Sequence, residues 1–503
     1  MKKNLISRYG IPAGLAVTTA GFFSSCRQAE VAEDLPNFII IFTDDQGYGD
    51  LGCYGSPNIR TPNIDRMAEE GVRFTSFYAA PFSAPSRAQL MTGCYPARVS
   101  HARNPGPSSP YGLHPDEITI AEVLKEKGYA TKAIGKWHLG DALEFLPVSQ
   151  GFDSYFGIPF SNDMWRYHPK MQPQPEEDSM MLAMRKRAAY TGFAGEGSYY
   201  RPKGGFPNDL PLMRDKEVIE LNPDQRYLTT RYTEEAISFI SENSNRPFFL
   251  YLAHNMPHVP LFVSGKYAGE SFRGLYGDVV MEIDWSVGRI LDKLKELGLD
   301  RNTMVIFTTD NGPWLQYGID GGSAGPLRAG KGTVYEGGVR VPAIFWWPGK
   351  IPAGRRTGEI AGNLDILPTL AGLAGAKVPD GRIIDGLDIW PLISGKSDRS
   401  PHEFFHYMAG SREGEANYLG IRDERWKLLV QIDEEGKVDP KELYDLGADV
   451  SERFNRIDQH REVVDRLVPE AQRFYDDLVQ NIRLAGHTKN RVPVYNKENY
   501  KIN

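Results

Sequence analysis

The chain has 503 residues, of which 41% are hydrophobic and 24% are charged, proportions that are ordinary for a globular protein. This length favours two or more domains with a substantial core. The formal net charge of −7 argues against general nucleic-acid binding, because a polyanion would be repelled, but a small anionic substrate needs only a local basic pocket.

The first 26 residues indicate export. A basic start, MKKNLISR, precedes the stretch YGIPAGLAVTTAGFF, which is too short and too glycine-interrupted to span a membrane as a helix. The small residues before Cys26 resemble the cleavage box of bacterial lipoproteins, with Phe23 in place of the usual aliphatic residue. We therefore expect residues 1–26 to be a lipoprotein-type signal peptide with a lipid on Cys26, and residues 27–36 to be a tether. Ordinary secretion is the alternative.

Apolar runs of strand length then alternate with helical patterns. The predicted strands are 37–43, 129–135, 247–253, 303–309 and 341–347. The predicted helices are 62–70, 83–93, 119–128 and 278–298. This alternation predicts an α/β fold with a mostly parallel sheet and helices on both of its faces. Ligands in such folds bind beyond the carboxyl ends of the strands.

The pattern changes near Lys377, where we place a domain boundary. The elements expected beyond it are strands within 417–431 and 441–446 and a charged amphipathic helix over about 458–482. We expect a catalytic domain over 37–377 and a smaller C-terminal subdomain, antiparallel sheet plus helix, over 378–503. Within the first, residues 164–226 form an insertion rich in Pro, Gly, Met and Arg, which we interpret as a lid or substrate-recognition segment.

Cys53 and Cys94 would be the two cysteines of the mature chain. One disulfide is arithmetically possible, but two cysteines make no disulfide framework. We expect two buried thiols.

Two pairs of oxygen-bearing side chains follow apolar strands. Asp44 and Asp45 follow the first strand, and Asp310 and Asn311 follow the fourth, each pair just before a turn where neighbouring side chains can converge. Four such ligands suit Ca²⁺ or Mg²⁺ far better than zinc. A single pair would more simply cap a turn or a helix, but two pairs in matching positions favour a metal site.

Basic and imidazole side chains follow other strands. Lys136 and His138 stand two apart in GKWHLG, a spacing that predicts one shared face. His254 and His258 follow a further strand, and Lys331 stands among glycines. A lone histidine is more often structural, and a lone loop lysine is usually solvated, yet three of only ten histidines fall at predicted strand ends.

The segment SAPSRAQLMTG begins at Ser83 and reads as a helix. In the simplest interpretation Ser83 caps this helix and Pro85 occupies its first turn. In the competing interpretation Ser83 carries chemistry, and Arg87, one turn later on the same face, holds it in place.

The charges of these residues suggest a substrate class. Three carboxylates would face five positive charges, namely a divalent cation, Arg87, Lys136 and Lys331. If these groups converge, the surplus of two positive charges suits a tetrahedral oxyanion ester. The residues alone therefore predict a hydrolase of sulfate or phosphate esters with a nucleophile near a metal.

Taken together, the motifs resemble the sulfatase family of the alkaline-phosphatase superfamily, over nearly the whole mature sequence. SAPSRAQLMTG matches the family signature, and TDDQGYGDLGCYG, GKWHLG, TTDNG, GKGTVYEGGVRVP and ELYDL match further motifs in the right order. The segment IPFSND and the C-terminal pattern are similar to the branch that contains arylsulfatase A and N-acetylgalactosamine-6-sulfatase. The resemblance implies an alkaline-phosphatase-like fold.

The resemblance also implies that Ser83 is oxidised after synthesis to formylglycine, an aldehyde that hydrates to a geminal diol. The oxygen-dependent maturation enzyme acts on cysteine, so a serine implies the radical-based anaerobic maturase. Together with the leader, this suggests a Gram-negative anaerobe that exports the protein to the periplasm or anchors it at the outer membrane. The implied ligands of Ca²⁺, with Mg²⁺ the less favoured ion, are Asp44, Asp45, Asp310, Asn311 and an oxygen of modified residue 83.

Further roles follow from the same resemblance. Arg87 would stabilise the diol, and Lys136, Lys331 and Ser161 would contact the sulfate. A diol oxygen would attack sulfur while His258, in the His-x-Pro position of the family, protonates the departing sugar oxygen. His138 would then take the proton of the second hydroxyl, so that sulfate leaves and the aldehyde re-forms.

The implied activity is hydrolysis of sulfate monoesters of carbohydrates, with galactose or N-acetylgalactosamine sulfate of host or algal glycans as the leading substrates. The candidate sugar contacts are His101, Arg103, Asp163, Trp165 and Arg166. Two alternatives remain. One is a phosphatase or phosphonate hydrolase with unmodified Ser83, although family phosphatases usually carry His where Asn311 stands. The other is a non-catalytic protein that binds sulfated glycans, if Ser83 is never oxidised.

Overall fold

The computed structural model describes residues 35–164, 209–378, 380–410 and 412–489. Beginning at Leu35, these residues belong to one compact unit. The predicted signal peptide with its lipidated Cys26, nearly all of the tether and most of the insertion 164–226 lie outside the described residues. The boundary near Lys377 stays a prediction.

A sheet of eleven strands runs through the described residues, in the order β11-β2-β10-β9-β1-β8-β4-β5-β6-β7, with β12 also paired to β2. The strands are β1 (Asn37–Thr43), β2 (Val72–Tyr78), β4 (Ala130–Gly135), β5 (Ser154–Gly157), β6 (Pro211–Arg214), β7 (Glu217–Leu221), β8 (Phe248–Ala253), β9 (Thr303–Thr309), β10 (Arg340–Trp346), β11 (Arg355–Thr357) and β12 (Ala361–Gly362). From β9 to β5 all neighbours are parallel, which confirms the predicted mostly parallel sheet. The predicted strand 341–347 is present as β10, but it runs antiparallel to both of its neighbours.

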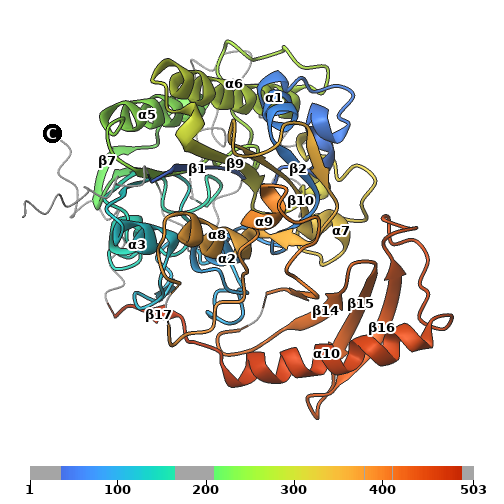
Figure 1. Cartoon of the computed structure of the whole chain (residues 1–503). Helices are drawn as coiled ribbons and strands as arrows, with labels where there is room; N and C mark the ends of the chain where they lie inside the picture. The colour runs from blue at the N-terminus through green and yellow to red at the C-terminus, as the bar shows by residue number, and fades with distance from the viewer. Residues whose placement is uncertain (1–34, 165–208, 379, 411, 490–503) are drawn as a thin grey trace, which may run out of the picture. The chain divides into compact units, whose positions relative to one another are not determined.

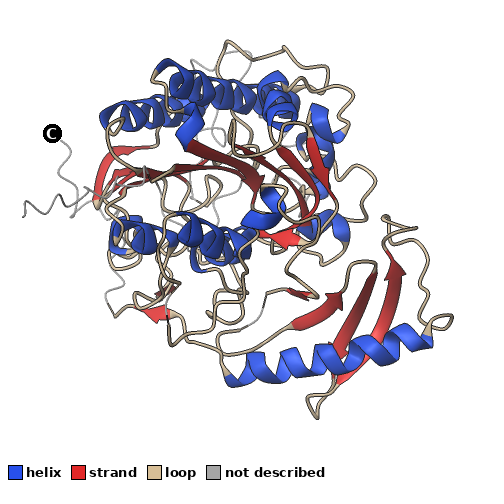
Figure 2. Cartoon of the chain, in the orientation of Figure 1, coloured by secondary structure: helices blue, strands red, loops and turns tan. Residues whose placement is uncertain are grey.

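Helices cover both faces of this sheet (Figures 1 and 2). On one face lie α1 (Pro62–Glu70), α5 (Leu228–Glu242) and α6 (Leu275–Glu296). On the other lie α2 (Ser83–Thr92), α3 (Ile120–Lys125) and α8 (Ile366–Leu373). Because both faces are covered, the apolar run Phe38 to Phe42 of β1 is 0% exposed throughout. The shorter helices are α7 (Glu336–Val339), α9 (Trp390–Ile393) and the 3-10 turns Tyr48–Asp50, Gly52–Tyr54, Pro147–Ser149, Gln225–Tyr227, Asp300–Asn302, Leu315–Asp320 and Asn363–Asp365.

The C-terminal region forms a second, antiparallel sheet, as predicted. Its strands are β13 (Phe405–Met408), β14 (Tyr418–Arg422), β15 (Trp426–Ile432) and β16 (Val438–Asp445). Helix α10 (Arg461–Gln480) crosses this sheet in Figure 1 and buries Val463 and Leu467 against Leu428 and Val430 in one apolar cluster. A further pair joins β3 (Tyr111–Gly112) to β17 (Gly486–His487).

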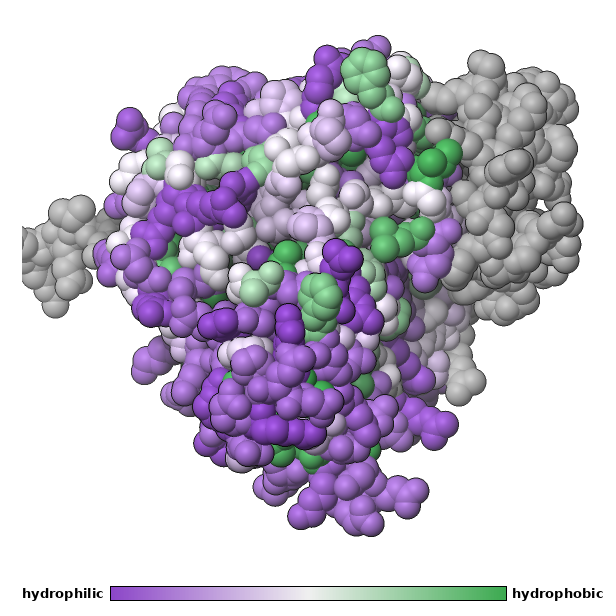
Figure 3. Space-filling model, turned by 90° about the vertical axis from the view of Figure 1, so that its right-hand side faces the viewer, coloured by the Kyte–Doolittle hydropathy of each residue, from purple (hydrophilic) through white to green (hydrophobic). Residues whose placement is uncertain are grey.

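The cysteines, the polarity of the helices and the surface bear on the remaining predictions. Cys53 and Cys94 are both free thiols; Cys94 is buried as predicted, whereas Cys53 is only half-buried. In the part of the chain that the structure describes, every helix is too short or too polar to cross a membrane. On the face drawn in Figure 3, hydrophobic residues form separate small patches among hydrophilic ones.

Candidate active site

The two acidic pairs meet because the strands that carry them are neighbours. Thr43 of β1 is paired with Thr309 of β9, so the residues that follow leave the sheet side by side. The Asp45 backbone N–H donates to Asp310 Oδ1 over 3.0 Å. Asp45 has φ of 61°, a left-handed turn that lets it share one space with Asp44, although successive strand residues point to opposite faces. The convergence expected from the sequence is therefore present.

Ser83 is the first residue of α2 and not its cap. The N-cap is Phe82, and no side chain caps the helix, so the predicted capping role of Ser83 is wrong. Ser83 Oγ lies instead 3.0 Å from Asp44 Oδ1 and 2.5 Å from Asp310 Oδ2. Since a hydroxyl has one proton, it can donate to only one of these carboxylates at a time. The side chain is thus held at the ends of β1 and β9 rather than at its own helix.

Arg87 lies one turn further along α2 and is 0% exposed. Its guanidinium is 3.0 Å from Asp310 Oδ2 and 3.4 Å from Asp44 Oδ2, the same two carboxylates that contact Ser83. It also donates to the Lys136 backbone carbonyl over 2.8 Å. The predicted pairing of Ser83 with Arg87 on one helix face is therefore observed.

Two lysines bring further positive charge. Lys136 Nζ forms an ion pair with Asp44 and lies 3.1 Å from Ser83 Oγ and 3.2 Å from Ser161 Oγ. Lys331 Nζ is 2.7 Å from Asp45 Oδ1. Burial lowers the pKa of Lys136, and the Asp44 carboxylate offsets this only in part. Burial also acts on Lys331, but there the carboxylates, Asp45 foremost, outweigh it and raise the pKa.

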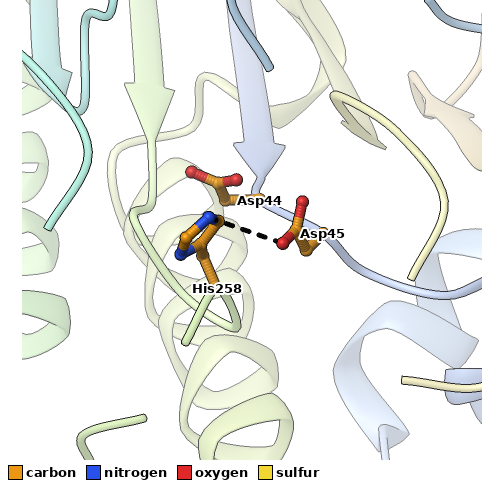
Figure 4. A group of neighbouring side chains, drawn as sticks. All are labelled: Asp44, Asp45 and His258. Atoms are coloured by element: carbon orange, nitrogen blue, oxygen red, sulfur yellow. Dashed lines mark ion pairs between the residues drawn. The ribbon is translucent and has the colours of Figure 1, made fainter. Parts of the chain in front are cut away.

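His258 faces the acidic pair, and His254 does not. His258 Nε2 is 3.6 Å from Asp45 Oδ2, and its Nδ1 donates to the Val259 carbonyl. Figure 4 shows its imidazole beside both carboxylates, on the segment that follows β8. His254 Nε2 lies 3.3 Å from Ser286 Oγ on α6, away from this group. The choice of His258 over His254 agrees with this geometry.

His138 is buried beside the site with φ of 63°. Neither of its ring nitrogens has a hydrogen-bond partner among the described residues. Burial, followed by the nearby charges of Lys136 and Arg87, places the pKa of His138 well below its usual value. The imidazole is therefore neutral, which is the form that a general base must have before it accepts a proton. It does not lie on the face of a strand as predicted, because β4 ends at Gly135.

The acidic group fits a divalent cation. Asp44, Asp45 and His258 can place ligand atoms within 4.8 Å of one another. Asn311 donates through Nδ2 to Asp45 Oδ1 over 2.7 Å, while its buried Oδ1 has no partner among the described residues. An orphaned amide oxygen beside three carboxylates is a donor set that a hard cation satisfies.

Comparison with known families decides what kind of site this is. Residues 36–376 match the family model described as Sulfatase, and residues 329–483 match the model described as N-sulphoglucosamine sulphohydrolase, C-terminal. The chain belongs to the sulfatase family. Members of this family are sulfuric ester hydrolases and generally use a formylglycine and a divalent metal ion. The predicted family and fold class are confirmed.

Individual relatives support the predicted branch of the sulfatases. Bovine (Bos taurus) arylsulfatase A is 38% identical over 463 residues, 87% of this chain and 85% of the relative. Canine (Canis lupus familiaris) N-acetylgalactosamine-6-sulfatase is 42% identical over 372 residues, 72% of this chain and 66% of the relative. Human (Homo sapiens) steryl-sulfatase is 40% identical over 435 residues, 75% of this chain and 73% of the relative. The crystal structure of Ps i-CgsB in complex with k-i-k-neocarrahexaose superposes with a TM-score of 0.73 at 32% identity, covering 91% of this chain and 96% of the other.

The sulfatase site also contains residues that the sequence analysis missed. The centre of the Trp314 ring lies 4.3 Å from Lys331 Nζ and 5.5 Å from the centre of the His258 ring, so Trp314 contacts both residues. Tyr251, inside β8, places its hydroxyl 3.3 Å from Arg87. An aromatic residue directly after TTDNGP was a visible signal for Trp314, whereas nothing distinguishes Tyr251 from an ordinary buried strand residue.

The predicted sugar contacts of the sulfatase are spread over several settings. His101 is buried, and burial lowers its pKa to about 4. Arg103 is exposed, with its guanidinium 4.4 Å from the centre of the Tyr111 ring. Asp163 is half-buried, and Trp165 and Arg166 lie outside the described residues.

Proposed function

We propose that this protein is an exported sulfatase that hydrolyses sulfate monoesters of carbohydrates, with Ser83 oxidised to formylglycine. One observation carries the proposal: Ser83 Oγ lies within hydrogen-bonding distance of Asp44, Asp310 and Lys136. Arg87 contacts the same two carboxylates. A nucleophile that is surrounded in this way can be activated and can attack an anionic ester.

We assign Asp44, Asp45, Asp310 and Asn311, with an oxygen of residue 83, as ligands of Ca²⁺. Five oxygen ligands from the protein suit Ca²⁺, because Mg²⁺ usually keeps several waters and takes few protein ligands. When present, the cation and the hydrated aldehyde would supply an activated oxygen nucleophile. The second hydroxyl of the hydrate would let sulfate leave by internal collapse, an intramolecular step whose effective molarity can reach about 10⁵ M or more.

The charge of the site suits an anionic ester such as a sulfate monoester. Three carboxylates balance Arg87, Lys136 and Lys331 in the described residues, so a divalent cation leaves two positive charges in surplus. Lys136 Nζ lies 3.1 Å from the Ser83 hydroxyl and 3.2 Å from Ser161 Oγ, so both side chains can donate hydrogen bonds to sulfate oxygens. Lys331 brings its positive charge beside Asp45, whereas Lys136 pairs with Asp44. This arrangement neutralises an anion while it is being attacked.

Two histidines supply the proton transfers. His258 directs Nδ1 to a backbone carbonyl, so Nε2 faces the acidic group, and in the imidazolium form it can donate its proton to the departing sugar oxygen. His138 is held neutral by its surroundings and can accept the proton that is removed when sulfate is released. The site thus offers one imidazole for each of the two proton transfers.

For the substrate we propose a galactose or N-acetylgalactosamine sulfate within a host or algal glycan. The named relatives act on different leaving groups, since they include a steryl-sulfatase as well as an N-acetylgalactosamine-6-sulfatase. The solved relative was crystallised with a neocarrahexaose, which favours a carbohydrate. The leader sequence and the serine at position 83 support export in a Gram-negative anaerobe, lipidation at Cys26 and maturation by the radical-based maturase.

Mass spectrometry of the peptide that contains Ser83, from protein coexpressed with an anaerobic maturase, tests the proposal. We expect this peptide to be lighter by two hydrogens, because the maturase removes them to convert CH₂OH to CHO. The modified enzyme should release sulfate from sulfated galactosides, and Ser83→Ala prepared in the same way should not. An unmodified Ser83 in protein that still cleaves sulfate esters would overturn the mechanism. An unmodified and inactive native protein that binds sulfated glycans would favour the non-catalytic alternative.

A further inference from the structure

A large cavity lies next to the candidate active site. Its volume is about 950 Å³, at the upper end of the range for ligand-binding sites. The lining residues used below are Phe82, Arg103 and Asn104 from the region of α2, and Arg412, Glu415 and Tyr475 from the C-terminal region. Two segments more than 300 residues apart in the sequence therefore form one cavity.

The cavity borders the residues that flank the nucleophile. Phe82 directly precedes Ser83, and Asn104 accepts a hydrogen bond from the Ala84 backbone over 2.9 Å. Phe82 also packs against the segment of Lys331, because a Cβ placed on Gly332 would lie 3.4 Å from its ring. The cavity therefore begins one residue away from the nucleophile.

The lining combines positive charge with aromatic surface. Arg103 and Arg412 are exposed, and in the described ranges neither forms an ion pair with a carboxylate. The acidic residue of the lining, Glu415, faces its own loop, where it accepts from the Arg412 backbone N–H over 3.4 Å. Guanidinium groups bind carboxylate and sulfate oxygens in a planar, often two-pronged geometry. Phe82 and Tyr475 offer ring faces against which the apolar face of a sugar can pack.

We propose that this cavity is a second substrate subsite, in which Arg103 and Arg412 bind an anionic group of the sugar next to the one that is desulfated. The anionic group is a sulfate ester or a carboxylate, which present the same oxygens to a guanidinium. The inference rests on the proposed sulfatase function. It makes an acidic oligosaccharide, and not an isolated sulfated sugar, the preferred ligand.

Binding to the Ser83→Ala protein, in which no turnover occurs, tests the proposal by calorimetry in the presence of Ca²⁺. The probes are a chondroitin 6-sulfate tetrasaccharide and N-acetylgalactosamine 6-sulfate. We expect the tetrasaccharide to bind at least about tenfold more tightly, and Arg103→Ala and Arg412→Ala each to weaken its binding about tenfold. The matched control is Arg461→Ala, an exposed arginine of α10 that pairs with Asp458 and lies outside the cavity lining. It should bind the tetrasaccharide like the parent.

Two modified tetrasaccharides identify the anionic group. Loss of affinity after reduction of the uronic carboxylates assigns the arginines to the carboxylate of the adjacent sugar. Loss only after removal of the 6-sulfate from the other N-acetylgalactosamine would instead assign them to a sulfate two sugars away. The proposal is overturned if both arginine variants bind the tetrasaccharide like the parent, or if the tetrasaccharide binds no more tightly than the monosaccharide. Because no step requires catalysis, these results do not depend on whether Ser83 is oxidised, and failure of the sulfatase function would show separately as absence of sulfate release.

Discussion

Two buried groups of charged side chains in this protein differ in how fully their polar atoms are paired. The active-site cluster consists of Asp44, Asp45 and Asp310 with Arg87, Lys136 and Lys331. The second, which we call the β15 network, consists of Lys427 on β15 with Glu336, Glu452 and Tyr78. In the β15 network Lys427 Nζ lies 2.8 Å from Glu336 Oε1, 2.9 Å from Glu452 Oε1 and 2.7 Å from the Val334 carbonyl that it donates to.

The difference lies in what each group leaves unpaired. In the β15 network the Tyr78 hydroxyl donates to Glu336 Oε2 over 2.8 Å, and Lys427, with Arg340 and Arg422, holds the pKa of Glu336 well below its usual range against the effect of burial. In the active site, Asn311 Oδ1 and both ring nitrogens of His138 are buried without a partner within the described residues. Buried polar groups are normally paired. In the β15 network Glu452 Oε1 has no hydrogen bond within the described residues, but it lies 2.9 Å from the Lys427 cation. Among those residues the active-site cluster offers its unpaired atoms no such internal partner and is completed only by a ligand.

The largest effect should come from removing one carboxylate of the active-site cluster. Asp310→Asn deletes a charge that faces both Ser83 and Arg87, and we expect turnover of matured enzyme to fall by more than about 10³-fold. Ca²⁺ should no longer raise the melting temperature, because a ligand that binds the native state stabilises it in proportion to its affinity. Steady-state kinetics and thermal denaturation with and without Ca²⁺ measure both effects.

The same change in the exposed Asp458, which pairs with Arg461 on the surface, is the control and should alter neither quantity. If Asp310→Asn kept its turnover and its response to Ca²⁺, the active-site cluster would not be a cation site.

The β15 network should show its effect in stability. Lys427→Met leaves Glu336 and Glu452 facing each other without their shared cation, and we expect the free energy of unfolding to fall by about 3–5 kcal/mol. Urea denaturation measures this loss. The matched control is Lys441→Met on β16, whose exposed pair with Asp439 contributes about 0–1 kcal/mol. Equal effects for the two lysines would contradict the role given to the network.

A smaller and more selective effect should follow from removing the proton donor. His258→Asn should lower turnover about 10²-fold on a sulfated sugar, whose alkoxide is a poor leaving group, and only a few-fold on 4-nitrophenyl sulfate, which needs little protonation. His254→Asn, on the same loop but facing α6, should show no difference between the two substrates. A uniform loss on both substrates would mean that His258 binds or positions rather than protonates.

The architecture could be predicted where a pattern reflects a physical requirement. The apolar run of β1 had to be covered on both faces, and polar pairs directly after two such strands had to meet if the strands were neighbours. The antiparallel direction of β10 could not be predicted, because an apolar run indicates that a strand is buried but not whether it runs parallel or antiparallel to its neighbours. The start of α2 at Ser83 was predicted correctly, but the capping role of Ser83 was not, because its hydroxyl contacts Asp44 and Asp310 instead of the backbone of its own helix.

Residues that act through distant contacts were harder to find. Trp314 acquires its place only when the segments of Lys331 and His258 are brought together. Arg412 lines the same cavity as Phe82 because the C-terminal region packs against the segment of α2. The spacing of residues in the sequence does not predict which distant segments pack together.

The burial of Ser83 determines when, relative to folding, this residue can be oxidised. Ser83 is 1% exposed, so a modifying enzyme could not reach its Cβ atom once the chain has folded. On our proposal, the aldehyde is therefore installed while the chain is still open, before translocation is finished. A cell that transported and folded the protein first would accumulate a well-formed but permanently inert molecule.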